Sequence, residues 1–174
     1  HLGNWEYFLP ILGFNDYNFS IVAQPIKNHY LNKYFLKIRT SENVEIIFKN
    51  ESTKKMIKAL NNDYFLGLAS DQNAGKKGTK VKFLNIEASI PKGAAIFHIK
   101  TKKPIILAYC IMDKNYKYQF TASLLDTSNI KLEKEDAIYR INSIFTDNLS
   151  EMIKLNTHQY FWFHKMKKKS LYKK

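Results

Sequence analysis

The sequence predicts an α/β fold in which a mostly parallel central sheet is flanked by helices. Short apolar runs alternate along the chain with stretches of helical periodicity, and this alternation is typical of a parallel sheet covered by helices. The chain has 174 residues, of which 45% are apolar, so it is long enough to bury a core. It shows no internal repeat and no interdomain linker. We therefore predict one domain over residues 1–164, followed by a basic tail over residues 165–174.

The first half of the chain predicts helices over residues 5–12, 28–40 and 53–60, and strands over residues 19–23, 44–48 and 64–69. Asn28 is the expected N-cap of the second helix, because its side chain can accept a hydrogen bond from a backbone N–H of the first turn. Apolar side chains recur at helical spacing in that helix, and we expect them to face the core: Tyr30, Leu31, Tyr34, Phe35 and Ile38.

The second half predicts strands over residues 81–84, 104–111 and 116–125, of which the second is the most hydrophobic and is expected to be central. The third alternates in polarity and is expected to be antiparallel or at an edge. One helix is expected after Pro91, which suits a first helical turn. Another is expected over residues 134–155, with one apolar stripe facing the core: Ile138, Ile141, Ile144, Phe145, Leu149, Met152 and Ile153.

A polar loop over residues 70–79 follows the strand 64–69, and ligands in open α/β sheets bind at the carboxyl ends of strands. Asp71 and Gln72 in this loop are candidates for anchoring substrate hydroxyls or for organising the loop, with ordinary turn chemistry as the alternative. The lysines around the loop either meet phosphate groups or form a solvated charged face: Lys76, Lys77, Lys80 and Lys82.

The residues best suited to catalysis stand at the start of the sequence. His1 and Glu6 have four residues between them, and on one continuous helix their side chains would point about 140° apart. They converge only if His1 ends a strand or turn and Glu6 lies in the first turn of the helix that follows. Gly3 and Asn4 suit such a change of direction. A carboxylate placed in this way orients a general base, and a surface histidine is the alternative.

The net charge of +13, from 28 Lys and Arg against 15 Asp and Glu, predicts attraction to an acidic partner. Such partners are nucleic acid, an anionic membrane, a phosphorylated lipid or an acidic carrier protein, and a lysine-rich solvated surface is the alternative. Arg39 is one of only two arginines, with Arg140. Its planar guanidinium suits a phosphate or a developing oxyanion, and a salt bridge on the helix surface is the alternative.

Cys110 is the single cysteine, so no disulfide forms within the chain, and we expect a buried thiol and a reducing compartment. The histidines lack metal-ligand spacing, so we predict no metal. Nothing in the sequence implies an organic cofactor, and we expect none. No apolar run approaches the roughly 20 residues that a membrane-spanning helix needs. Because a base at His1 needs a strand to deliver it, we expect further residues before His1, which would carry any membrane anchor.

Four segments, in this order, carry a resemblance to a known family. They are the His-X4-acid block of residues 1–6, residues 23–28 with Arg39, residues 67–93, and residues 159–165, which are similar to a terminal Gln-Trp-X-Trp-X-His-Arg signature. The chain resembles the bacterial lipid A biosynthesis acyltransferases, within the wider lysophospholipid acyltransferase group. The first block alone is weakly specific, but the ordered set covers nearly the whole chain. Tyr160 stands where the terminal signature has a tryptophan.

The resemblance implies a glycerolipid-acyltransferase-like fold. It also implies transfer of a fatty acyl chain from an acyl carrier protein thioester to a hydroxyl of a lipid A precursor or related glycolipid. His1 would be the general base and Glu6 would orient it. The residues expected to bind substrate are Arg39, Asp71, Gln72, Lys76, Lys77 and Lys82. The expected partners are the acidic carrier protein, a phosphorylated glycolipid and an anionic membrane at the cytoplasmic face of the inner membrane, and no nucleic acid is expected.

Two alternatives stay open. One is a catalytically impaired or truncated relative that binds lipid without turnover. The other is a basic nucleic-acid-binding domain, for which affinity would fall steeply with salt across many sequences.

Overall fold

The computed structural model describes residues 1–51 and 53–164, so the predicted tail and Ser52 lie outside the described residues. The chain divides into two compact units. One consists of residues 5–69, and the other combines residues 1–4 with the chain from residue 70 onward.

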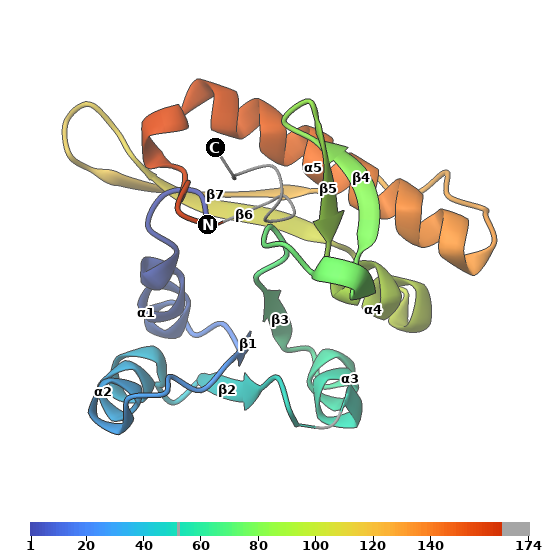
Figure 1. Ribbon diagram of the computed structural model, residues 1–174. Helices are drawn as coiled ribbons and strands as arrows, with labels where there is room; N and C mark the ends of the chain where they lie inside the picture. The colour runs from blue at the N-terminus through green and yellow to red at the C-terminus, as the bar shows by residue number, and fades with distance from the viewer. Residues whose placement is uncertain (52, 165–174) are drawn as a thin grey trace. The chain divides into compact units, whose positions relative to one another are not determined.

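The unit of residues 5–69 is built on a parallel sheet with the strand order β2-β1-β3. The strands are β1 (Phe19–Ala23), β2 (Val44–Phe48) and β3 (Phe65–Leu68). The helix α2 (His29–Arg39) joins β1 to β2, and α3 (Thr53–Asn61) joins β2 to β3. Figure 1 shows α2 and α3 on opposite sides of this sheet. Two connections of the same handedness must place their helices on opposite sides of the sheet here, because the connection from β2 to β3 runs back across β1.

The predicted apolar helix near the start of the chain is present in two parts. A 3₁₀ turn covers Trp5–Tyr7, and α1 covers Phe8–Phe14. Pro10 lies in the first turn of α1, where its missing N–H has no intrahelical partner to lose. Leu9 is the buried residue of this helix, and α1 packs beside α2 against β1 and β2.

The predicted core stripe of α2 was wrong in all but one residue. Its inward face consists of half-buried side chains that recur at helical spacing: Asn32, Phe35, Leu36 and Arg39. The other residues of the predicted stripe are exposed: Tyr30, Leu31, Tyr34 and Ile38. The inward face is partly polar because Asn32 accepts a hydrogen bond from the backbone N–H of Ile26 at 2.9 Å and Arg39 forms an ion pair. A rule based on apolar periodicity assigns such a face to solvent.

The second unit contains two antiparallel hairpins. One pairs β4 (Thr79–Phe83) with β5 (Ile86–Ile90), and the other pairs β6 (Ile106–Met112) with β7 (Tyr118–Leu124). The prediction of a mostly parallel central sheet therefore holds only in part, for the sheet of residues 5–69. Short turns join the strands of each hairpin, and such turns can connect only antiparallel neighbours.

The sequence analysis missed strand β5. Its residues alternate in burial, but the turn before it consists of Leu84 and Asn85, both with positive φ, at 49° and 63°. Such a pair is typical of a tight two-residue hairpin turn, which usually carries Asn-Gly. A leucine in the first position hides that signal, because it extends the apolar run of β4 instead of ending it.

Two helices complete this unit, α4 (Gly93–Thr101) and α5 (Lys134–Leu155). The bounds predicted for the long helix are confirmed. The later part of its stripe, from Ile144 to Ile153, packs in a core with residues of β4, β5 and β6, whereas Ile138 and Ile141 pack with Ala95 of α4. Figure 1 shows α5 running alongside the β6–β7 hairpin. Ile138, Ile141 and Ile153 are each at most 2% exposed. Within residues 1–51 and 53–164, no helix has both the length and the apolar character needed to cross a bilayer.

Candidate active site

Residues 1–4 form a short segment within the second unit, although residues 5–69 of the other unit separate them in sequence from the rest of it. Leu2 forms an antiparallel bridge with Tyr160, and Gly3 forms a parallel bridge with Cys110 in β6. Leu2 is 3% exposed and belongs to the main core of the unit. The segment therefore delivers His1 as the end of a strand would.

Gly3 is required in this segment for two reasons. Its φ is +69°, a left-handed conformation that favours glycine. A Cβ at this position would lie 1.8 Å from the carbonyl oxygen of Cys110, which is shorter than any non-bonded contact. The close approach allows the N–H of Asn4 to donate to that same oxygen at 2.7 Å.

The segment after α5 holds the other side of residues 1–4. The backbone carbonyl of Gln159 accepts from the N–H of Gly3 at 2.8 Å, and the N–H of Phe161 donates to the carbonyl of His1 at 3.1 Å. The side-chain amide of Gln159 pairs with the main chain of Met112 through two hydrogen bonds of 2.9 Å. Gln159 thus ties the end of β6 to the segment that positions His1.

Both ring nitrogens of His1 have partners in the loop that follows residue 70. The Nδ1 atom lies 2.6 Å from Oδ1 of Asp71, and the Nε2 atom lies 3.2 Å from the side-chain nitrogen of Gln72. A carboxylate only accepts hydrogen bonds, so Nδ1 is the donor in the first contact. This leaves a lone pair on Nε2, which accepts from the Gln72 amide. A neutral imidazole with a carboxylate on Nδ1 is the arrangement of an oriented general base.

Asp71 is 4% exposed, and a buried carboxylate needs several donors to offset its desolvation. Its Oδ2 atom also contacts the main-chain nitrogen of His1. The hydroxyl of Tyr160 donates a further hydrogen bond to Asp71. Burial, together with the Asp71 charge and this hydrogen bond, raises the pKa of Tyr160 well above its usual value, so the tyrosine stays protonated as a donor. Tyr160 is itself 8% exposed.

The loop carrying Asp71 is anchored at several points. The N–H of Asn73 donates to Nε2 of His164 at 3.1 Å. Ser89 in β5 accepts from the N–H of Ala74 through its carbonyl at 2.9 Å and donates its hydroxyl to the carbonyl of Gly75 at 2.6 Å. The loop is therefore held by β5 on one side and by the C-terminal segment on the other.

Glu6 lies in the unit of residues 5–69, where both of its carboxylate oxygens accept from Arg39 of α2. The Arg39 Nε donates to Oε2 at 2.9 Å, and its terminal nitrogen donates to Oε1. The guanidinium also stacks on Phe35, with its central carbon 4.8 Å from the ring centre. The predicted orientation of His1 by Glu6 stays a prediction. The carboxylate placed against the His1 ring in its own unit is that of Asp71, which the sequence analysis assigned to substrate binding.

The predicted substrate-binding lysines lie on exposed positions of the second unit. Lys76 and Lys77 belong to the 3₁₀ turn Gly75–Lys77, and Lys82 lies on the solvent side of β4. Lys80, on the same side of β4, forms an ion pair of 3.2 Å with Glu87 of β5. Their predicted contact with phosphate stays a prediction.

Tyr160 and His164 were not among the predicted site residues. Both belong to the aromatic-rich segment that carries the terminal family signature, and this membership is the signal that could have found them. Within the described ranges, no group of three or more His, Cys, Asp or Glu side chains is placed to hold a metal ion.

The model of a family described as bacterial lipid A biosynthesis acyltransferase matches residues 1–169. No curated protein matches the chain.

Proposed function

The chain belongs to the bacterial lipid A biosynthesis acyltransferase family, and we propose that it transfers a fatty acyl group from an acyl carrier protein thioester to a hydroxyl of a lipid A precursor, with His1 as general base. Family membership implies the acyltransferase activity itself. The observation that carries the finer proposal is the contact of 2.6 Å between Nδ1 of His1 and the buried carboxylate of Asp71.

In the proposed mechanism, Asp71 holds the Nδ1–H tautomer of His1 and stabilises the imidazolium that forms during the reaction. Tyr160 supports Asp71 by donating its hydroxyl. Gln72 contacts Nε2, and the acceptor hydroxyl would take its place there. This exchange leaves the number of hydrogen bonds to Nε2 unchanged, because the Gln72 amide and the acceptor hydroxyl each donate one to the same lone pair.

In the proposed acyl transfer, every proton and bond is accounted for by His1, the acceptor hydroxyl and the thioester. Nε2 of His1 takes the proton of the acceptor hydroxyl while its oxygen attacks the thioester carbonyl carbon. The tetrahedral intermediate then collapses as the C–S bond breaks. The leaving thiolate of the carrier takes the proton back from Nε2, which returns the imidazole to its starting state. The products are the ester and the free carrier thiol.

We further propose that the reaction takes place at the cytoplasmic face of the inner membrane. The net charge of +13 favours both an acidic carrier protein and a phosphorylated glycolipid as partners. Arg39, Lys76, Lys77 and Lys82 are the proposed contacts for their anionic groups.

The test is acyl transfer measured by mass spectrometry, with lipid A precursor and a mixture of acyl carrier thioesters. We expect His1→Ala to lower turnover by about 10²–10⁴-fold, the usual contribution of a general base. We expect Asp71→Asn to lower turnover by at least about 10²-fold, because an amide holds the imidazole without stabilising its charged form. His158→Ala and Asp126→Asn are matched controls, since both side chains are exposed in the same unit.

The variant Glu6→Gln separates the two candidate orienting carboxylates. Because Arg39 engages both oxygens of Glu6, we expect a smaller loss of turnover in Glu6→Gln than in Asp71→Asn. The reverse order would assign the orienting role to Glu6. Lipid binding without any transfer by the unaltered chain would instead support the impaired relative.

A further inference from the structure

The outer face of α2 is an exposed apolar stripe. Its side chains are Tyr30, Leu31, Tyr34 and Ile38, which are 83%, 50%, 59% and 43% exposed. Their positions fall within one sector of the helix, since residues three, four and seven apart share a face. Isolated exposed apolar residues are ordinary, but four on one face of an 11-residue helix form a patch.

The stripe is not a displaced core face. The opposite face of α2 already packs inward, with Phe35 and Leu36 lining a small hollow against Ile46 and Phe48 of β2. Arg39 on that inward face is held by its ion pair with Glu6. Rotating the helix to bury the stripe would break this ion pair and expose Phe35. The helix is therefore anchored with its apolar stripe outward.

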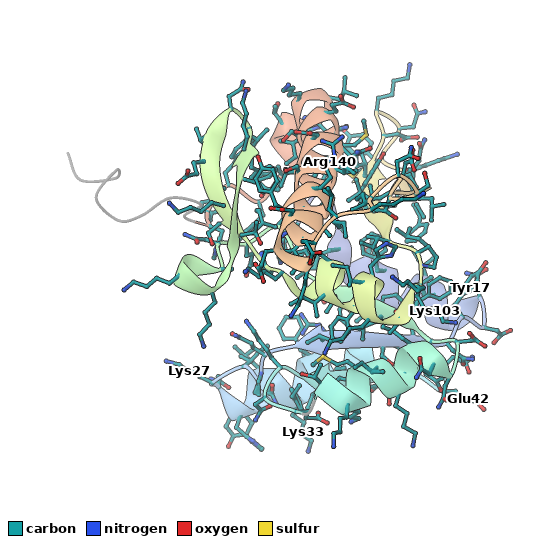
Figure 2. All side chains as sticks on the ribbon, turned by 90° about the vertical axis from the view of Figure 1, so that its right-hand side faces the viewer. Tyr17, Lys27, Lys33, Glu42, Lys103 and Arg140 are labelled. Carbon is teal, nitrogen blue, oxygen red and sulfur yellow. The ribbon has the colours of Figure 1, made fainter. Side chains whose placement is uncertain are left out.

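The polar positions beside the stripe are basic. Lys33 and Lys37 lie on α2 and Lys27 precedes it; all three are exposed, and α2 contains no acidic residue. Figure 2 labels Lys27 and Lys33 at the rim of this unit. Long lysine side chains can reach phosphate groups while their carbon stems extend along the apolar surface. Tyrosine has an apolar ring and a polar hydroxyl, and this combination favours the boundary between hydrocarbon and water.

We propose that this face of α2 docks on the surface of an anionic lipid bilayer. The apolar stripe enters the boundary between headgroups and acyl chains, while Lys27, Lys33 and Lys37 contact lipid phosphates. Charge complementarity selects this partner over a second copy of the chain, which would place the same lysines against each other. The apolar stripe selects it over nucleic acid, whose backbone offers no hydrocarbon for Leu31 and Ile38.

The test is co-sedimentation of the full chain with vesicles of phosphatidylethanolamine and phosphatidylglycerol, and with vesicles of phosphatidylcholine alone. We expect binding to the anionic vesicles that weakens as KCl rises from about 0.1 M to about 1 M, where screening shortens to about 3 Å. Lys33→Glu with Lys37→Glu should weaken binding about 25-fold or more, at about fivefold for each basic residue near such a surface. Tyr34→Ser with Ile38→Ser should weaken it about tenfold, including at high salt.

Matched control variants distinguish the effect of this face from the effects of net charge and of exposed apolar side chains elsewhere in the chain. Lys58→Glu with Lys154→Glu makes the same change in net charge, from +13 to +9, at exposed positions on α3 and α5. Tyr139→Ser with Leu155→Ser removes a similar exposed pair from α5. Equal losses in the control and α2 variants would overturn the proposal. So would equal binding to both vesicle types, or a dimer in solution that only the α2 variants dissociate. The assay contains no acyl donor, so its outcome is independent of the proposed catalysis.

Discussion

Replacement of Gly3 by alanine tests whether the close approach at Cys110 positions His1. The new Cβ would lie 1.8 Å from the carbonyl oxygen and 2.6 Å from the carbonyl carbon of Cys110. Both are main-chain atoms of a paired strand, so neither can move without disturbing β6. Residues 1–4 must leave their place instead.

The cost of that displacement can be worked out from the contacts. Three backbone hydrogen bonds, from Gly3 to Gln159, from Asn4 to Cys110 and from Phe161 to His1, contribute about 1 kcal/mol each. The buried side chain of Leu2 contributes about 2 kcal/mol. We expect Gly3→Ala to lower the free energy of unfolding by about 3–5 kcal/mol in urea denaturation.

Gly75→Ala is the matched control. Gly75 also has a positive φ, at +61°, but a Cβ there would meet nothing within 4 Å. We expect it to cost only about 1 kcal/mol. Acyl transfer should fall by at least about 10²-fold in Gly3→Ala, because the displaced segment carries the base. Equal stability of the two variants, or full activity in Gly3→Ala, would refute the reasoning.

Three further predictions concern single groups. Asn28→Ala should lower the free energy of unfolding, measured in urea, by about 1 kcal/mol, because the Asn28 side chain accepts a hydrogen bond from the N–H of Leu31 at the start of α2. An unchanged free energy of unfolding would show that the cap contributes nothing. Tyr160→Phe should cost about 1.5–3 kcal/mol at neutral pH through the lost hydrogen bond to Asp71. The folded pKa of Tyr160 is raised above the ordinary tyrosine value of 10.0, so this contribution to stability is complete below that pH and is lost as the pH rises through the folded pKa. The difference in stability between the unaltered chain and Tyr160→Phe should therefore narrow in alkali. A difference that stays constant with pH would contradict the assignment. Cys110 is 0% exposed and burial raises the pKa of its thiol, so a thiol reagent should label it only after denaturation, and rapid labelling of the native protein would contradict that burial.

Local sequence rules succeeded where neighbouring residues decide the outcome. The strands Phe19–Ala23 and Val44–Phe48 and the helix Lys134–Leu155 have the bounds that periodicity predicts. The cap at Asn28 is also confirmed, because a cap depends only on residues within one helical turn.

Residue types near the candidate site were also readable from the sequence. A histidine, a nearby acid and a polar loop after a strand suggested where the chemistry lies. Which carboxylate contacts the ring was not readable, because Glu6 is close to His1 in sequence while Asp71 is seventy residues away. Proximity along the chain drew attention to Glu6, and orientation of His1 by Glu6 stays a prediction.

The sequence by itself therefore determined the family, the identity of the candidate base and most of the helices and strands, since motif order and periodicity are properties of the chain. Only the tertiary structure decided that Asp71 and Tyr160 surround the His1 site and that the tyrosines of α2 point outward. Both outcomes depend on packing between distant segments. The buried carboxylate of Asp71 needs hydrogen-bond donors, and Arg39 on the inward face of α2 needs the carboxylate of Glu6. These requirements outweigh the local preference of any one helix or turn.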